Sequence, residues 1–244
     1  MAFAPRLPRL IPVLDVKAGL VVRAVAGRRE HYRPLISQLT PSTDPCEVAQ
    51  TLIETTSAQE LYVADLDAIG TGHVSPCVLQ LLTLSRTNIW IDAGFGPQLG
   101  LDALPNLPHI RPVIGLETCH TPTLIHPGPR TVAFSIDLYN GILLDNWRSW
   151  GLSDSHDIVG LARQVIAREV HTLIVLDLAR VGTGSGCGTE ALLRAIRAEF
   201  PEVELIAGGG VRSWDDVDRL AEAGADAVLV ASALHDQTLR IPRG

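Results

Sequence analysis

One stretch of this chain occurs twice in nearly the same form, and this repeat restricts the fold more than any other feature. Residues 61–72 read LYVADLDAIGTG, and residues 173–184 read LIVLDLARVGTG. In each copy an apolar run of strand length leads through an Asp into a segment that closes with Gly-Thr-Gly. The copies lie 112 positions apart. Such a repeat indicates a fold assembled from two similar halves.

Three further pairs of segments extend the repeat in the same order along the chain. RLIPVLDVKAG at residues 9–19 matches VAFSIDLYNG at residues 132–141, which places Asp15 opposite Asp137. AGFG at 93–96 matches AGGG at 207–210, and VIGLETCHTPTL at 113–124 matches VLVASALHDQTL at 228–239. We therefore predict a duplicated half of four units, with halves of about residues 8–128 and 129–240.

Eight apolar runs of strand length alternate with segments of helical periodicity. The predicted strands cover residues 10–16, 60–65, 88–92, 110–116, 131–137, 171–177, 203–207 and 226–230. The clearest helices cover residues 46–56, 76–84, 158–168, 190–200 and 214–223, and the fourth and eighth helices are expected to be short. This alternation implies parallel strands.

Eight such units in two sets of four predict a (β/α)8 TIM barrel built from two (β/α)4 half-barrels. A barrel of this kind commonly uses a chain of this length as one domain, so we expect residues 1–244 to form a single domain. An open doubly wound sheet is the alternative, but that architecture gives no reason for a four-plus-four repeat.

Composition excludes several classes of function. The formal charge is −7 with no long basic block, which argues against binding along a nucleic-acid backbone. The four cysteines are widely spaced, which favours reduced thiols and gives no support to a zinc site. No apolar run reaches membrane-spanning length, and no signal-peptide core precedes Pro12. We expect a cytoplasmic protein without a membrane, nucleic-acid, metal or cofactor site.

Two aspartates close apolar strands at the end of the barrel where active sites of this architecture are built. Asp15 ends the first predicted strand and Asp137 the fifth, so their side chains should face each other across the mouth. A carboxylate at the edge of an apolar core is costly unless it is bonded or used. Alone, either residue is more typical of a loop cap. Their matching places in the repeat favour a catalytic pair for acid–base chemistry.

A glycine-rich loop follows the seventh predicted strand. Gly208, Gly209 and Gly210 let backbone N–H groups approach an anion, and the helix start after them adds favourable partial charge. Ala231 and Ser232 begin a second helix beside this loop. Loops seven and eight commonly form a phosphate site in barrels, so we predict one here. A tight turn without a ligand is the alternative.

The first-half counterpart of this loop is weaker. Gly94 and Gly96 remain as candidate substrate contacts. Asp92 precedes them, and Glu117 stands where the second half has Ser232. Carboxylates repel an anion, so we do not expect a second phosphate at this end.

Other residues near the mouth are candidate substrate contacts or loop ties. Thr183 and Gly184 offer a hydroxyl and a backbone N–H group, and Arg23 offers a charge. The loop Gly27–Ser37 adds three arginines and either closes over an anionic ligand or is solvated. Three aspartates are expected to tie loops, namely Asp65, Asp67 and Asp177. Three histidines lack metal-ligand spacing and are expected to be ordinary loop or helix-end residues, namely His73, His120 and His235.

Six motifs in order make the chain resemble the barrel family of histidine biosynthesis: IPVLDVKAGLVVR, LYVADLD, FSIDLYNG, VGTGSG, IAGGGVRS and DAVLVASALH. The resemblance runs from about Leu10 to Leu239. The family comprises phosphoribosylformimino-AICAR-phosphate isomerase and the cyclase subunit of imidazole glycerol phosphate synthase, both half-barrel duplications. The resemblance implies that Asp15 and Asp137 are the catalytic pair of an aldose–ketose (Amadori) rearrangement. It also implies phosphate binding at the second-half glycine loop and matches Thr183 to a family threonine.

The chain departs from the family pattern at two places. Val181 stands where family members usually carry an Asp, and the loop Gly27–Ser37 resembles that of paralogues found alongside methanopterin-type one-carbon metabolism. Three interpretations follow. The first is an acid–base isomerase acting on a phosphorylated small molecule in that metabolism. The second is the histidine-pathway isomerase or the cyclase, which would need a glutaminase partner. The third is a barrel that binds a phosphorylated ligand without catalysis.

Overall fold

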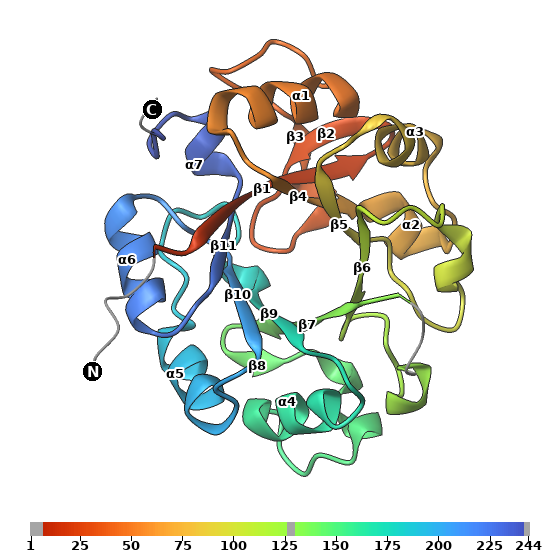
Figure 1. The fold of residues 1–244 in the computed structure, drawn as a ribbon, viewed down its shortest axis with the longest axis vertical. Helices are drawn as coiled ribbons and strands as arrows, with labels where there is room; N and C mark the ends of the chain where they lie inside the picture. Colours follow the sequence, from red (N-terminus) through yellow and green to blue (C-terminus); the bar gives the residue numbers. More distant parts are fainter. Residues whose placement is uncertain (1–6, 126–129, 242–244) are drawn as a thin grey trace.

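Eight parallel strands pair in the order in which they occur in the chain and close on themselves (Figure 1). They are β1 (Arg9–Lys17), β4 (Glu60–Asp65), β5 (Asn88–Asp92), β6 (Ile110–Gly115), β7 (Ala133–Tyr139), β9 (Thr172–Asp177), β10 (Glu204–Gly208) and β11 (Ala227–Val230). The last strand pairs with the first, from Arg9 opposite Ala227 to Pro12 opposite Val230. This computed structural model, which describes residues 7–125 and 130–241, confirms the predicted (β/α)8 TIM barrel.

Helices surround the barrel on its outer side (Figure 1). The long ones are α1 (Pro45–Thr56), α3 (Pro76–Leu84), α4 (Ile158–Ile166), α5 (Glu190–Glu199) and α6 (Trp214–Glu222), all within two residues of the predicted bounds. The short ones are η2 (Leu101–Ala103), η3 (Pro122–Leu124), η4 (Asp145–Trp150) and α7 (Ser232–His235). No helix in the described ranges is long and apolar enough to span a bilayer. The predicted boundary between the halves, residues 128 and 129, lies outside the described residues.

The strands are apolar along their length because both of their faces are buried. One apolar cluster fills the barrel, with Ile11, Trp90, Val113, Ile174 and Ile206 among its members. Alternate strand residues point outward and pack against the helices in a second, larger cluster. Parallel strands that lie between these two apolar clusters have continuous hydrophobic sequences. Their bounds can therefore be predicted from the sequence.

Each half of the barrel contains a β-hairpin after its first strand, which the sequence analysis did not predict. β1 turns back into β2 (Leu20–Arg23), and β7 turns back into β8 (Ile142–Leu143), each in an antiparallel pair. Both turns use two residues with positive φ: 51° and 77° at Ala18 and Gly19, and 54° and 77° at Asn140 and Gly141. Such turns match the twist of the hairpin strands. The match supports the duplication of a half-barrel.

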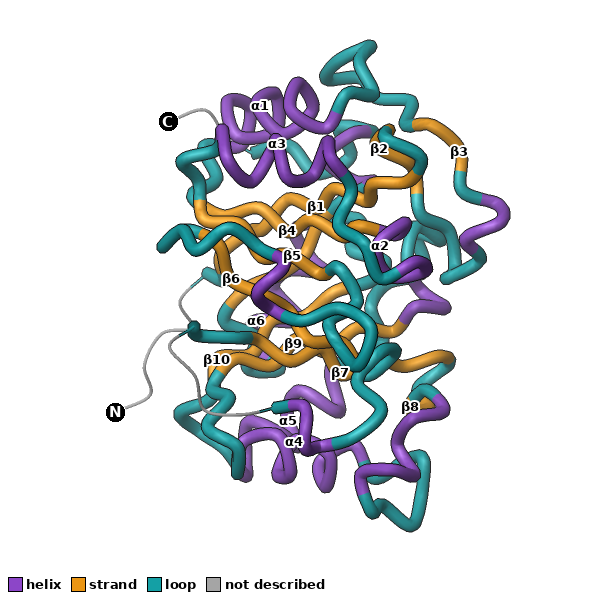
Figure 2. Tube along the Cα trace, turned by 90° about the vertical axis from the view of Figure 1, so that its right-hand side faces the viewer, coloured by secondary structure: helices purple, strands orange, loops and turns teal. Residues whose placement is uncertain are grey.

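The hairpins lie at one end of the barrel. Figure 2 shows β2, β3 (Arg33–Pro34) and β8 together at its right-hand side, beyond the carboxyl ends of the barrel strands. The loop between β2 and β3 contains a single helical turn, η1 (Arg29–His31). The carboxyl end of the barrel therefore carries the two hairpins and the loop between β2 and β3.

Three aspartates tie the loops at this end, as predicted. Asp65 accepts hydrogen bonds from the backbone N–H groups of Ala68 (3.0 Å) and Ser75 (2.7 Å), and so begins the short helix α2 (Leu66–Thr71) where a loop was expected. Asp177 precedes the turn η5 (Leu178–Arg180) and accepts from Gly141 N (2.9 Å). Asp67 accepts from the N–H of Ala18 (2.6 Å).

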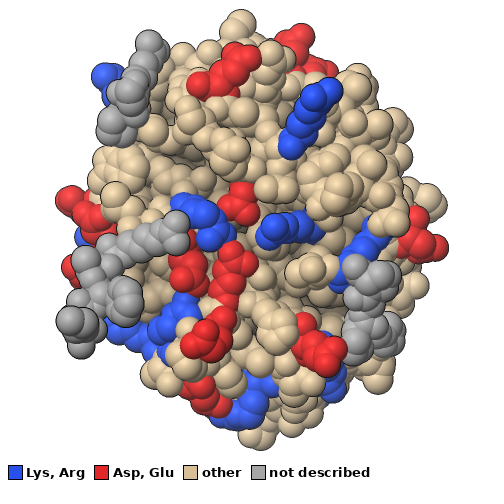
Figure 3. All heavy atoms as spheres, in the orientation of Figure 1, with Lys and Arg blue, Asp and Glu red and all other residues tan. Residues whose placement is uncertain are grey.

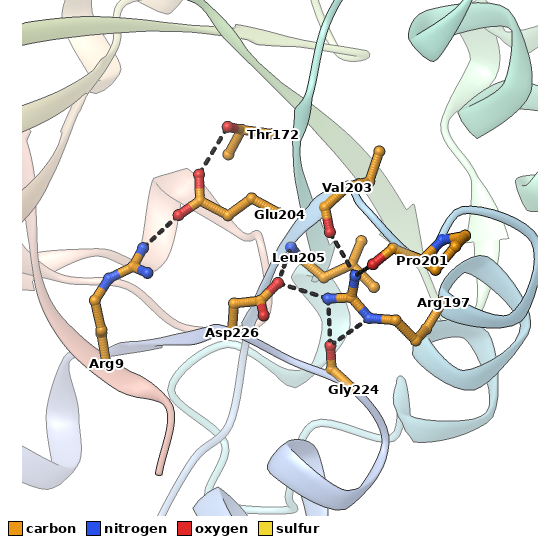
Figure 4. A network of polar contacts seen from close by, with 9 residues as sticks. All are labelled: Arg9, Thr172, Arg197, Pro201, Val203, Glu204, Leu205, Gly224 and Asp226. Carbon is orange, nitrogen blue, oxygen red and sulfur yellow. Dashed lines mark hydrogen bonds and ion pairs between the residues drawn. The ribbon is translucent and has the colours of Figure 1, made fainter. Parts of the chain in front are cut away.

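The opposite, amino-terminal end is closed by ion pairs. Figure 3 shows basic and acidic side chains together near the centre of the face that Figure 1 presents. Arg9 binds Glu60 (2.8 Å). Arg9 also binds Glu204 (2.5 Å), which accepts from Thr172 Oγ1 (2.8 Å) (Figure 4). Beside them, the Arg197 guanidinium donates to backbone carbonyls and to Asp226 (Figure 4). Beneath this network the barrel is filled with apolar side chains.

Candidate active site

A cavity of about 780 Å³ opens among the loops at the carboxyl ends of the strands. Both halves of the barrel contribute to its wall, and so does the loop between β2 and β3. This is the end at which barrel active sites are built, and the volume suits a small molecule. Its polar lining includes four acids, Asp15, Asp92, Glu117 and Asp137.

Asp15 and Asp137 line this one cavity from opposite halves of the barrel. Asp137 is buried and accepts hydrogen bonds from Ser135 Oγ (2.6 Å) and from the N–H of Glu117 (3.2 Å). Burial, together with the charge of Asp92, raises the pKa of Asp137 to about 8. Burial also raises the pKa of Asp15 to about 7, against the opposing effect of Arg29. Two carboxyls with such pKa values exchange protons readily near neutral pH.

Asp92, at the end of β5, is a third acid beside this pair. It accepts hydrogen bonds from Gly94 N (3.1 Å) and from the Tyr62 hydroxyl (3.3 Å). Burial raises the pKa of Asp92 to about 6. A Cβ atom added at Gly115 would lie 3.0 Å from Asp137 Oδ2 and 3.7 Å from Asp92 Oδ2. The two carboxylates therefore converge over the backbone of β6.

Tyr62 lies on the inner wall between these acids. Burial raises the pKa of its hydroxyl, and the charges of Asp92, Asp137 and Asp15 raise it further. Its proton is therefore retained at neutral pH, and the hydroxyl serves as a hydrogen-bond donor in the cavity. Sequence reasoning did not select Tyr62, because nothing in an apolar strand marks which aromatic side chain faces a cavity.

The loop Gly27–Ser37 folds over the acids. Arg29 reaches Glu117, 88 positions further along the chain, with 2.6 Å between Nη2 and Oε2. The loop is anchored on one side by Lys17 Nζ, which donates to the carbonyl of Arg29 (2.6 Å), and on the other by Ala26 N, which donates to the carbonyl of Val181 (2.8 Å). The loop covers part of the cavity through Arg29, whereas Arg28 and Arg33 are exposed, and closure over an anionic ligand stays a prediction.

The glycine loop after β10 forms the opposite side of the cavity. Gly209 and Gly210 line it with φ values of 93° and 80°, which favour glycine. A Cβ atom at Gly210 would lie 2.7 Å from the carbonyl oxygen of Gly186. Gly208 does not line the cavity, because it is packed between Leu176 and Leu229.

The other residues predicted for this side gather around the glycine loop. Ala231, Ser232, Thr183 and Gly184 all line the cavity. The Thr183 hydroxyl is engaged by its own loop, since it donates to the carbonyl of Arg180 (2.8 Å). Arg212 lines this side as well and is paired with Asp216, so its charge is countered.

Arg23 lines the cavity with its charge already countered. Its guanidinium forms a two-pronged ion pair with Asp236, whose side chain also lines the cavity. His235 ends α7, as expected, and is also buried in the cavity wall, where Ser37 Oγ lies 3.0 Å from Nδ1. Burial lowers the pKa of His235 to about 4, so the ring is neutral.

Gly94 and Gly96 lie behind the cavity wall and do not line it. A Cβ atom at Gly94 would lie 2.7 Å from the Cα of Ile69, and one at Gly96 would lie 2.6 Å from the carbonyl oxygen of Thr118. Close packing of loops explains both glycines. Their predicted contact with substrate gains no support from this position.

No group of three or more His, Cys, Asp or Glu side chains within the described residues is arranged to hold a metal ion. The chemistry available in the cavity is that of carboxyls, phenols, guanidinium groups, hydroxyls, an imidazole and backbone N–H groups. These groups can bind an anion on one side and move protons in the centre.

A closed eight-stranded barrel with acids of raised pKa in a cavity at its carboxyl end has the architecture of a barrel enzyme. The chain matches the model of the Histidine biosynthesis protein family over residues 9–240, and it belongs to that family. The resemblance drawn from the six motifs is thereby confirmed.

Relatives match this chain over nearly its whole length. An uncharacterized protein of Methanocaldococcus jannaschii is 28% identical over 234 residues, which is 95% of each chain. 1-(5-phosphoribosyl)-5-((5-phosphoribosylamino)methylideneamino) imidazole-4-carboxamide isomerases from two strains of Thermus thermophilus are 29% and 30% identical over 240 residues, which is 96% of this chain and 97% of each relative. These relatives support an enzyme of the isomerase type, and such identities are consistent with a divergent paralogue.

Proposed function

We propose that this protein is an aldose–ketose isomerase that acts on a phosphorylated small molecule, with Asp15 and Asp137 as its proton-transfer pair. The observation that carries the proposal is the presence of both carboxyls, each with a raised pKa, in one cavity at the carboxyl end of the barrel. Named isomerases among its relatives support the reaction type. Such pairing of acid and base is the requirement of this chemistry.

The charges around the two aspartates support a division of roles between them. Arg29 lies near Asp15 and favours its ionised form, which suits a base. Asp92 and Glu117 lie near Asp137 and favour its protonated form, which suits an acid. Asp137 then protonates the ring oxygen as the C1–O bond breaks and the nitrogen lone pair forms a C=N bond. Asp15 removes the C2 proton, the enaminol forms, and proton transfer from O2 and to C1 gives the aminoketose.

The glycine loop supports a phosphate on the substrate. Gly209, Gly210 and Ser232 line the cavity on the side away from the acids. Backbone N–H groups beside glycines of positive φ form concave sites for anions. One phosphate bound there orients the sugar carbons toward the centre of the cavity.

The amino-terminal end of the barrel supports an isomerase over the cyclase. A glutaminase docked at that end would have to deliver ammonia along the barrel axis. Arg9 spans Glu60 and Glu204 there. Trp90, fully buried beneath them, donates to Glu60 (3.2 Å), and the Arg111 guanidinium stacks on its ring. An ammonia path would have to displace this packed arrangement.

We place the reaction in methanopterin-type one-carbon metabolism because the loop Gly27–Ser37 resembles that of paralogues found there. The same loop folds over the active cavity through Arg29, so it contributes directly to the choice of substrate. Genes for one-carbon coenzymes beside this gene would support the placement, and histidine genes would oppose it.

The test uses a deletion strain of the native host. A phosphorylated metabolite should accumulate in the strain, and the purified full-length protein should convert it to an isomer of equal mass and different retention time. Asp15→Asn and Asp137→Asn proteins should leave it unchanged. Rescue of a histidine auxotroph that lacks the isomerase would instead establish the histidine-pathway function, and full activity of both variants would refute the assigned pair.

A further inference from the structure

The two ends of the active cavity occupy equivalent places in the two halves of the barrel but carry opposite chemistry. Where β10 ends in glycines, β5 ends in Asp92. Where β11 is followed by Ser232, β6 is followed by Glu117. The position that would hold a second phosphate in a symmetric barrel therefore holds two carboxylates. Each of them lines the cavity.

A cation already sits at this acidic end. The guanidinium of Arg29 binds Glu117, with 2.6 Å between Nη2 and Oε2, and it lies near Asp15 and Asp92. Arg29 belongs to a loop that is remote from these acids in sequence, so the contact is a tertiary one. The space between the acids thus accepts a charged nitrogen group and its hydrogen-bond donors.

The Arg29 guanidinium alone does not neutralise the carboxylates at the acidic end of the cavity. Asp15 and Asp92 have no ion-pair partner within the described part of the chain, whereas Asp137, with its raised pKa, is mostly protonated at neutral pH. Lys17, the other cation near the loop, donates instead to the backbone carbonyl of Arg29. Hydrogen-bond acceptors in excess of donors in a cavity removed from bulk water favour a ligand that brings both positive charge and N–H groups.

We infer that Asp92 and Glu117 select a substrate that carries a protonated nitrogen at the end remote from its phosphate, and that they exclude a second phosphate. This inference rests on the proposed function and names its substrate class: a sugar-like monophosphate with a basic amine or amidine. Such a molecule lies across the cavity with its phosphate on Gly209 and Gly210 and its nitrogen at the acids. The carbons between them then lie beside Asp15 and Asp137.

Equilibrium binding of three probes to the full-length protein tests the inference. The probes are glucose 6-phosphate, glucosamine 6-phosphate and fructose 1,6-bisphosphate, measured by calorimetry at about pH 6.5, where the amine is mostly protonated and Asp92, with its pKa of about 6, is mostly ionised. Glucosamine 6-phosphate should bind about tenfold more tightly than glucose 6-phosphate, which corresponds to about 1.4 kcal/mol. The bisphosphate should bind most weakly. Equal affinity for the first two probes, or tightest binding of the bisphosphate, would overturn the inference.

Two sets of variants sharpen the test. Asp92→Asn with Glu117→Gln should abolish the preference for the amine and improve binding of the bisphosphate. The matched control, Asp218→Asn with Glu222→Gln on the exposed side of α6, removes the same charge and should change nothing. Arg29→Gln frees Glu117 and should tighten binding of glucosamine 6-phosphate. Weaker binding in Arg29→Gln would mean that Arg29 holds an anionic group, and that result also contradicts the inference.

The outcomes separate this inference from the proposed function. If glucose 6-phosphate binds, and Gly210→Ala weakens it while the amine adds nothing, the phosphate site stands and only the amine preference fails. If none of the three probes binds, or if Gly210→Ala leaves all three unchanged, both fail. Thermal melting of each variant shows whether it is folded.

Discussion

Asp137 and Asp92 converge on one glycine. The place where Gly115 would carry a Cβ atom is 3.0 Å from Asp137 Oδ2 and 3.7 Å from Asp92 Oδ2. Gly115 lies on β6, between the strands that carry the two acids. A side chain at this position would press on both carboxyls, so the glycine is what allows β5 and β7 to present their acids side by side.

Gly115→Ala should therefore lower turnover more than substrate binding. The added methyl group displaces the Asp137 carboxyl by a few tenths of an ångström, and displacements approaching 1 Å in a catalytic group cost up to roughly 100-fold. We expect kcat to fall about tenfold, with KM changed little, in steady-state kinetics. Gly70→Ala is the control, since a Cβ atom there meets nothing within 4 Å. Equal effects of the two substitutions would contradict the role assigned to Gly115.

Asp15→Asn and Asp137→Asn should each lower kcat/KM by roughly 10²- to 10⁴-fold, the usual contribution of a positioned acid or base. The amide keeps the size of the side chain but cannot transfer the proton. Isomerisation of the metabolite identified in the deletion strain is the measurement. A loss below about fivefold for either variant would place that aspartate outside the proton-transfer pair.

The plot of kcat/KM against pH should be bell-shaped. The base, Asp15, must be ionised, and its pKa of about 7 sets the acidic limb; the acid, Asp137, must be protonated, and its pKa of about 8 sets the basic limb. Asp92→Asn removes a negative charge that raises the pKa of Asp137. We therefore expect the basic limb of kcat/KM to move to lower pH in this variant. A basic limb that does not move would show that Asp137 is not the acid.

Stability should fall as the pH rises from about 4 to about 8. The folded Asp137 binds its proton up to a pKa of about 8, whereas the unfolded residue releases it near its ordinary pKa of 3.8. Between these values the folded state holds more protons, so the free energy of unfolding decreases with increasing pH. Asp137→Asn removes this dependence. The free energy of unfolding of the Asp137→Asn protein, measured with urea, should rise by at least about 1 kcal/mol relative to that of the natural protein between pH 5 and pH 8.

Gly210→Ala should weaken the binding of phosphate and lower stability. A non-glycine residue with positive φ costs about 1–2 kcal/mol, and here the added Cβ atom would also lie 2.7 Å from a carbonyl oxygen. Gly151→Ala is the matched control, with a φ of 73° and nothing within 4 Å of the added atom. Both variants should lose stability, Gly210→Ala more. Only Gly210→Ala should lose affinity for inorganic phosphate, as measured by calorimetry.

The sequence predicted the barrel well because parallel strands buried on two faces are continuous apolar runs. The predicted bounds of β4 and β5 agree with the structure at both ends, and the other six strands agree within two residues. The hairpins β2 and β8 were missed because their strands are short and half-exposed. The two-residue turns before them, Ala18-Gly19 and Asn140-Gly141, were the available signal.

The candidate site was predicted in part. The repeat placed Asp15 and Asp137 together, and both line the cavity. The comparison of the two halves treated Asp92 and Glu117 only as carboxylates that repel a phosphate, because the second half has a phosphate-binding loop at the same place. It did not consider what these carboxylates could bind. Arg29 was seen as one of several basic loop residues. Its contact with Glu117 joins segments far apart in sequence, and no local pattern encodes such a contact.

The unequal ends of the cavity decide how a ligand can enter. A scaffold made of two like halves could accept an elongated molecule in either of two opposed orientations, and only one of them brings the correct carbon to the base. Here the acids Asp92 and Glu117 face the backbone N–H groups of the glycine loop across the cavity. We therefore expect a molecule with unlike ends to bind in a single direction. The backbone retains the repeat of the two halves, but the side chains that line the cavity do not. This difference in side chains limits the ligand to one of the two orientations.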